Sequence, residues 1–106
     1  MLLIFKIFII FKGSFPCKET GPLTLGHEFA GTIISIGESV TTFKVGDRVT
    51  VDPNNGCSLC DDCHKGCYHL CLKGGINNTI GIFRDGGWST HAIAPESQVN
   101  ILDNFF

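Results

Sequence analysis

Four cysteines lie within one short, polar stretch of the chain, and no other feature constrains the fold as strongly. They are Cys57, Cys60, Cys63 and Cys71, and their neighbours include Asn, Gly, Ser, Asp and His residues. Cysteine is usually a small buried hydrophobe, but this stretch offers it few apolar surroundings. Four thiolates brought together by a short loop are the donors that a soft metal ion requires. The spacing therefore predicts a metal-binding loop at about residues 53–73.

The identity of the fourth ligand separates two metal interpretations. With Cys71, the spacing is C-x2-C-x2-C-x7-C, and four thiolates would form a closed, structural zinc site. With Cys67 instead, the spacing is C-x2-C-x2-C-x3-C, as in bacterial iron–sulfur ferredoxins, but Tyr68 stands where those proteins normally have Pro. A third alternative is a set of free thiols or disulfides. Zinc bound through Cys71 is the favoured prediction, which leaves Cys17 and Cys67 as ordinary thiols.

The length and charge of the chain restrict its class. With 106 residues it forms one small domain, which a bound metal or a partner surface would help to stabilise. A net charge of −2 provides no basic face, so a nucleic-acid partner is not expected. The apolar residues 1–11 are fewer than the roughly 20 that span a bilayer, and no Ala-x-Ala-like cleavage site follows them. We expect no membrane partner. For this segment the alternatives are a signal or anchor, an edge strand, or a replacement for a different sequence.

Short β-branched runs separated by glycine turns predict a mainly β fold, a small partly open barrel with one inserted loop. No segment shows the spacing of a long helix, and the absence of G-x-G-x-x-G argues against a Rossmann domain. The predicted domain covers residues 13–106, after an apolar segment at residues 1–12. The predicted strands are residues 29–36, 48–51, 79–83, 88–94 and 98–102, while residues 40–43 are short and half-polar and precede a turn at residues 44–47.

Three motifs flank the cysteine loop in a specific order. They are Gly26-His27-Glu28-Phe29-Ala30-Gly31, then Val45-Gly46-Asp47-Arg48-Val49, and, after the loop, Asp85-Gly86-Gly87-Trp88. In this order they resemble the GroES-like catalytic domain of the zinc-containing medium-chain alcohol dehydrogenases, over about residues 11–104. Residues 74–84 are most similar to the polyol branch, the sorbitol- and altritol-dehydrogenase-like enzymes.

The resemblance implies a function and a set of site residues. His27 would correspond to a ligand of the catalytic zinc, Glu28 to the acidic residue beside it, and the four cysteines to the structural zinc site. The family reaction transfers a hydride between a small alcohol or polyol and NAD or NADP, with the catalytic zinc as a Lewis acid. A cytoplasmic location would agree with such an enzyme.

The sequence also departs from that family. The family's Cys-Gly-Ser/Thr-Asp-x-His segment is missing, and its cysteine ligand would fall near Ile4. A further ligand normally follows the strand that ends near Leu102. We therefore expect a dehydrogenase fragment, truncated at both ends, that keeps structural zinc but is inactive by itself. The alternatives are a zinc-stabilised binding module that docks through Phe105 and Phe106, and a small iron–sulfur electron carrier.

Overall fold

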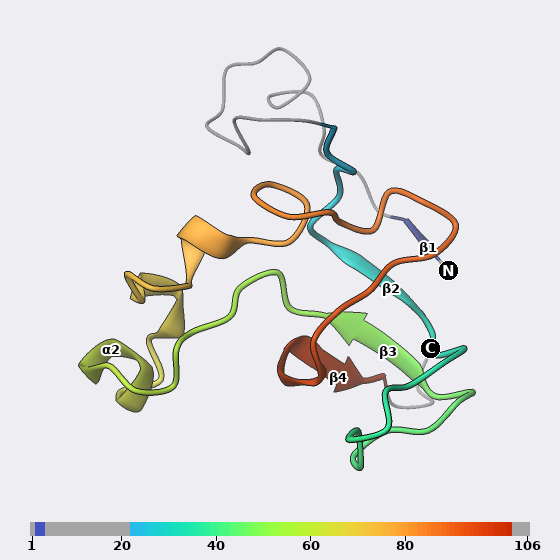
Figure 1. Cartoon of the computed structure of the whole chain (residues 1–106), viewed down its shortest axis with the longest axis horizontal. Coiled ribbons are helices and arrows are strands. Elements are labelled where there is room, and N and C mark those ends of the chain that lie inside the picture. The colour runs from blue at the N-terminus through green and yellow to red at the C-terminus, as the bar shows by residue number, and fades with distance from the viewer. Residues whose placement is uncertain (1, 4–21, 103–106) are drawn as a thin grey trace.

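A four-stranded antiparallel sheet forms the body of the domain (Figure 1). The computed structural model describes residues 2–3 and 22–102. The strands follow the order of the sequence, and each pairs with the next one along the chain. Their bounds are β1 Leu2–Leu3, β2 Phe29–Thr32, β3 Arg48–Val51 and β4 Val99–Ile101.

The core lies on the face of the sheet that the sequence alternation predicts. Val49 and Val51 of β3 are both buried, as residues two apart on a strand share one face. Phe29 pairs with Val51 across β2 and β3 and is also buried. Ile80 packs against Phe29 and Val51, although it comes from a loop far along the chain. The mainly β fold class and the strand at residues 48–51 are thus confirmed.

The first predicted strand is shorter than expected. The strand predicted at residues 29–36 ends at Thr32, and Ile34 is 66% exposed beyond it. Just beyond the ladder, two backbone bonds still join the two arms of this loop, Ile33 N to Asp47 O and Gly46 N to Ile33 O, both 2.9 Å. Residues 40–43 form no strand.

The predictions at residues 79–83 and 88–94 are wrong. The first segment is a tight turn that contains only an isolated bridge between Ile80 and Arg84. The second has the backbone N–H of Trp88 bonded to Leu25 O, but it then bends at Ser89, whose hydroxyl donates to His91 O. An apolar, β-branched composition does not make a strand where no neighbouring strand continues the ladder. The last predicted strand, residues 98–102, is confirmed as β4.

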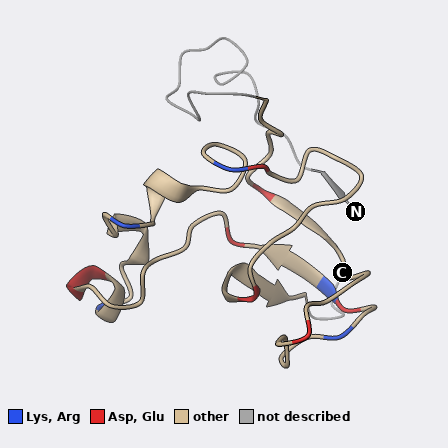
Figure 2. Cartoon of the chain, in the orientation of Figure 1, with Lys and Arg blue, Asp and Glu red and all other residues tan. Residues whose placement is uncertain are grey.

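The described helices are all short, as predicted. They are α2 Asp61–His64 and the 3₁₀ turns η1 Tyr68–Leu70, η2 Ile76–Asn78 and η3 Glu96–Gln98. None of the helices in residues 22–102 has the length and apolar character to cross a membrane. In Figure 2 the Lys and Arg residues of this part of the chain are scattered rather than gathered on one face.

The apolar start of the chain is described only in part. Leu2 and Leu3 pair with Ala30 and Phe29, so the edge-strand alternative is correct for these two residues. The rest of residues 1–12, together with Cys17, Phe105 and Phe106, lies outside the described residues.

Candidate metal centre

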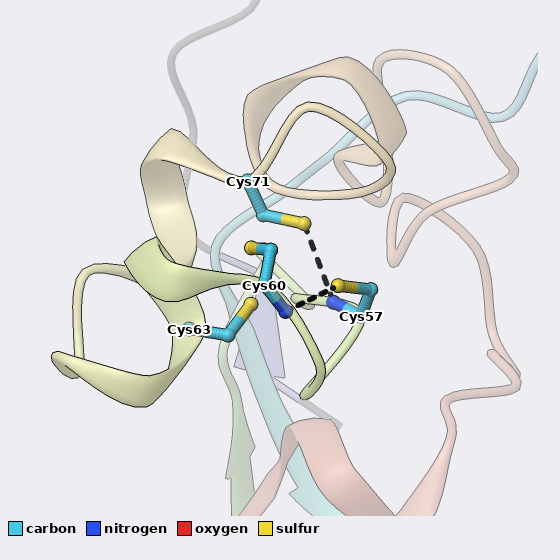
Figure 3. Close-up of side chains that lie close together, drawn as sticks. All are labelled: Cys57, Cys60, Cys63 and Cys71. Atoms are coloured by element: carbon cyan, nitrogen blue, oxygen red, sulfur yellow. Dashed lines mark hydrogen bonds between the residues drawn. The ribbon is translucent and has the colours of Figure 1, made fainter.

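The sulfur atoms of the four predicted ligands converge on one point (Figure 3). Cys57, Cys60, Cys63 and Cys71 place them all within 4.8 Å of one another. Zn–S bonds of about 2.3 Å in a tetrahedron put the sulfurs about 3.8 Å apart, which lies within this range. Cys71 is buried and the other three are half-buried. The donor set and its geometry therefore suit a zinc ion.

These ligands belong to a loop that leaves the sheet after β3, the metal lobe (residues 55–75; Figure 1). An isolated bridge between Asn55 and Gly75 closes its base, with Gly75 N donating to Asn55 O at 2.7 Å. Gly75 has φ +54°, and a Cβ there would lie 2.7 Å from His69 O. At Gly56 a Cβ would lie 2.5 Å from Cys63 Sγ. Glycine at these two positions lets the chain close tightly around the sulfurs.

Backbone N–H groups point at two of the sulfurs. Cys57 Sγ accepts from the N–H groups of Leu59 at 3.4 Å and Cys60 at 3.3 Å, while Cys71 Sγ accepts from Cys57 N at 3.4 Å. Ser58 adopts φ +62° between them, which turns the chain back over the Cys57 sulfur. Hydrogen bonds of this kind favour the thiolate form, which is the form that binds metal.

The thiol pKa values within the cluster shift in opposite directions. The N–H groups of Leu59 and Cys60 lower the pKa of Cys57, and the N–H of Cys57 lowers the pKa of Cys71 to about 6. At Cys60, an N–H from Cys63 lowers the pKa, but the Cys63 side chain, burial and the other neighbouring thiols outweigh it and raise the pKa to about 11.

Cys67, the alternative fourth ligand, does not join this cluster. Its N–H donates to Asp62 O at 2.8 Å, and its sulfur lies 4.0 Å from Lys65 O. The structure therefore assembles the C-x2-C-x2-C-x7-C set and not the ferredoxin-like one. All five cysteines in residues 22–102 are free thiols, so the disulfide alternative is wrong for these residues.

A side-chain hydrogen bond ties the metal lobe to the sheet. The hydroxyl of Tyr68 in η1 donates to the carboxylate of Asp52, the residue that follows β3. The other carboxylate oxygen of Asp52 accepts from Asn54 N at 3.0 Å, and Asp52 N donates to Gln98 O at 2.7 Å. This hydrogen bond was not predicted from the sequence, since Tyr68 carried no signal except its place beside Cys67.

We expect the Tyr68→Phe substitution to remove a pH-dependent part of the stability. The bond to Asp52 and the charge of that carboxylate raise the pKa of Tyr68, so the fold favours the neutral phenol. The contribution is present in full below the ordinary tyrosine pKa of about 10 and is lost as pH rises through the higher folded value. Urea unfolding should show wild type more stable by up to about 1 kcal/mol at pH 8, because the bond is partly exposed. The difference should decrease as the pH rises above about 10, and a constant difference would contradict this.

His27 and Glu28 lie away from the metal lobe, immediately before β2. His27 is half-buried and Glu28 is exposed. Neither belongs to the cysteine cluster, which is the one group of three or more His, Cys, Asp or Glu side chains in residues 22–102 that could hold a metal ion. Their assignment to a catalytic site consequently stays a prediction that depends on the sequence motif.

The backbone before His27 is held by the segment that carries the Asp85-Gly86-Gly87-Trp88 motif. Gly86 N donates to Thr24 O at 2.8 Å, and Gly87 N donates to Gly26 O at 2.9 Å. The carboxylate of Asp85 accepts from Thr24 N at 2.9 Å. The two motifs recognised in the sequence are therefore neighbours in space.

Glycines make this contact possible. We call Gly26, Gly81, Gly86 and Gly87 the glycine seam. A Cβ at Gly81 would lie 2.3 Å from Gly26 O, and a Cβ at Gly86 would lie 2.1 Å from the same oxygen. Backbone from two distant parts of the sequence, around Gly26 and in residues 81–87, thus meets closely beside His27.

The fold and the cysteine cluster together define a mainly β domain with a candidate metal site. Residues 6–103 match the alcohol dehydrogenase GroES-like domain family. The chain belongs to this family.

The relatives are several times longer than this chain. It is 39% identical over 82 residues to L-threonine 3-dehydrogenase of Symbiobacterium thermophilum, covering 77% of this chain and 22% of that protein. With sorbitol dehydrogenase of Halalkalibacterium halodurans, identity is 38% over 93 residues, or 87% and 26% of the two chains. Galactitol-1-phosphate dehydrogenase from Escherichia coli is a solved structure with a TM-score of 0.74 and 35% identity, over 83% and 25%. The chain thus spans about a quarter of the length of these relatives.

Proposed function

We propose that the chain is part of the catalytic domain of a zinc-dependent dehydrogenase that oxidises a small alcohol or polyol with NAD or NADP, and that its cysteine cluster binds a structural zinc. The convergence of four sulfur atoms within 4.8 Å of one another is the observation that supports the proposed structural zinc. Four thiolates satisfy a tetrahedral zinc completely, so no position is left for water or substrate. Zinc in this lobe stabilises the fold and takes no part in the reaction.

His27 is the residue that we assign to the catalytic site of the complete enzyme, with Glu28 beside it. A zinc ion there supplies Lewis-acid chemistry to the alcohol oxygen. His27 provides one nitrogen donor, and the adjoining glycine seam fixes the backbone from which its side chain projects. Among the described residues His27 belongs to no group of three or more potential metal ligands. The sequence also has no G-x-G-x-x-G, so we expect no dehydrogenase activity from this chain by itself.

A reducing compartment such as the cytoplasm fits this assignment. Thiolate ligands must stay unpaired to bind zinc, and disulfides form and persist in oxidising compartments. The five cysteines of residues 22–102 are free thiols, which supports the proposed location.

Metal analysis of the purified 106-residue chain tests the proposal. We expect about one zinc per chain and no iron, because the four-thiolate set is complete. The His27→Ala substitution should leave the zinc content and the melting temperature nearly unchanged, since His27 lies outside the cluster. Bound iron with broad visible absorption would support the electron-carrier alternative instead. Two zinc ions in wild type and one in the His27→Ala variant would show that the catalytic site is already assembled.

A further inference from the structure

Gln98, the last residue of the 3₁₀ turn η3 before β4, is completely buried, with 0% of its surface exposed. Its amide group makes two hydrogen bonds to distant parts of the chain. Gln98 Oε1 accepts from Arg84 Nη2 at 2.6 Å, and Gln98 Nε2 donates to Asp52 O at 2.7 Å. The Gln98 amide therefore uses both its donor and its acceptor: the donor bonds to Asp52 just after β3, and the acceptor bonds to Arg84 in a loop.

Arg84 holds that loop at two points. Its Nε donates to Asn78 O at 3.0 Å, and its own carbonyl accepts from Gly81 N at 2.7 Å. The guanidinium group thus spans the tight turn at residues 78–84 and attaches it to Gln98. A hydrogen bond to a charged donor in a partly buried position is stronger than one between neutral groups.

The turn that Arg84 holds is also the one that touches His27. At Gly81 the turn approaches so closely that a Cβ would lie 2.3 Å from Gly26 O and 2.8 Å from His27 N. The segment just after Arg84 supplies the N–H groups of Gly86 and Gly87 that bond to Thr24 and Gly26. A shift of this turn must therefore move the backbone on which His27 is placed.

We propose that Gln98 and Arg84 are positioning residues for His27: a buried hydrogen-bonded pair that anchors the 78–84 turn to the end of β3 and so fixes the backbone of the proposed catalytic ligand. The functional meaning of this pair rests on the proposed function, since that assigns His27 to the catalytic site. The anchoring of the 78–84 turn by Gln98 and Arg84 rests only on the contacts described above. Removing the Gln98 amide would leave the Arg84 guanidinium and Asp52 O without their partner, and a buried polar group without a partner is costly.

Amide hydrogen exchange on the full chain, measured by NMR, tests the proposal with the Gln98→Met variant. We expect the amides of Gly86 and Gly87, which bond to the segment before His27, to exchange about tenfold faster than in wild type, through local opening. The Ile33 and Gly46 amides, at the far end of the sheet, should keep their rates. The imidazole carbon signals of His27 should shift, while the zinc content stays the same.

Matched variants separate positioning from general stability. Asn100→Met, an exposed position two residues further along in β4, should change none of these signals. Arg84→Met should reproduce the pattern of Gln98→Met, and combining the two should add little. If all protected amides, including Ile33 and Gly46, accelerated by the same factor, or if Gly86 and Gly87 did not change, the proposal would be overturned.

Two further results keep the test decisive. Should the Gln98→Met variant fail to fold, the same comparison on Gln98→Glu decides, because glutamate keeps an acceptor for Arg84 but places a carboxylate oxygen, which cannot donate, against Asp52 O. A wild-type chain without zinc would refute the proposed structural zinc, yet the exchange rates of Gly86 and Gly87 would still test the anchoring of the turn.

Discussion

The Cys60→Ser substitution should release the metal and unfold the metal lobe. A serine hydroxyl binds zinc more weakly than a thiolate does. The metal lobe also has little apolar core of its own, because Cys71 is the only buried hydrophobic side chain in residues 55–75. Structural zinc contributes about 10–16 kcal/mol in small zinc-binding peptides, which is comparable with the whole stability of a domain. We expect the zinc content to fall from about one to well below one half per chain, and the melting temperature to fall with it.

Cys67→Ser is the matched control for this experiment. Cys67 lies in the same lobe and is also half-buried, but its sulfur is outside the cluster. Its replacement should leave the zinc content unchanged and shift the melting temperature only slightly. Equal loss of zinc in the two variants would mean that the ligand set has been assigned incorrectly. Metal analysis after gel filtration, together with thermal unfolding by circular dichroism, provides both measurements.

Replacing Gly81 with Ala should strongly destabilise the chain. The added Cβ would lie 2.3 Å from Gly26 O and 2.8 Å from His27 N, and neither backbone atom can move without disturbing the seam. The conformation at φ +76° adds strain of about 1–2 kcal/mol for a residue with a Cβ. We expect a total loss above about 4 kcal/mol, measured as the free energy of unfolding in urea.

Gly46→Ala isolates the strain from the collision. Gly46 has φ +98°, also in the left-handed region, but nothing lies within 4 Å of the place that its Cβ would take. This variant should therefore lose only the strain of about 1–2 kcal/mol and remain folded. If Gly81→Ala were no worse than Gly46→Ala, the close approach of the seam to His27 would not be a determinant of stability.

The sequence predicts best where the interacting residues are local. The ligands of the metal lobe follow one another within a single loop, so their spacing alone was enough to predict their convergence. The alternation of Val49 and Val51 likewise indicated both the strand and its buried face. Both patterns come from residues that are close together in the sequence, so they can be recognised without knowing which distant segments those residues contact.

The predictions failed where distant backbone segments meet. Residues 79–83 were predicted as a strand from their apolar composition, but Gly81 must turn there to reach Gly26. Gln98 was read only as the beginning of a strand, since no local pattern shows that its amide will be buried between Asp52 and Arg84. A polar residue reveals such a role only when the fold has brought its partners together.

The continuity of the metal lobe has a consequence for the order of events at the ribosome. All four sulfur ligands, and Gly75 that closes the loop, are synthesised before the first residue of β4. The contacts among the ligands are made within the lobe, so an ion can be captured while the last strand of the sheet is still inside the exit tunnel. A nascent chain would then carry its zinc before it has a completed sheet, and zinc supply during translation would govern the yield of folded protein.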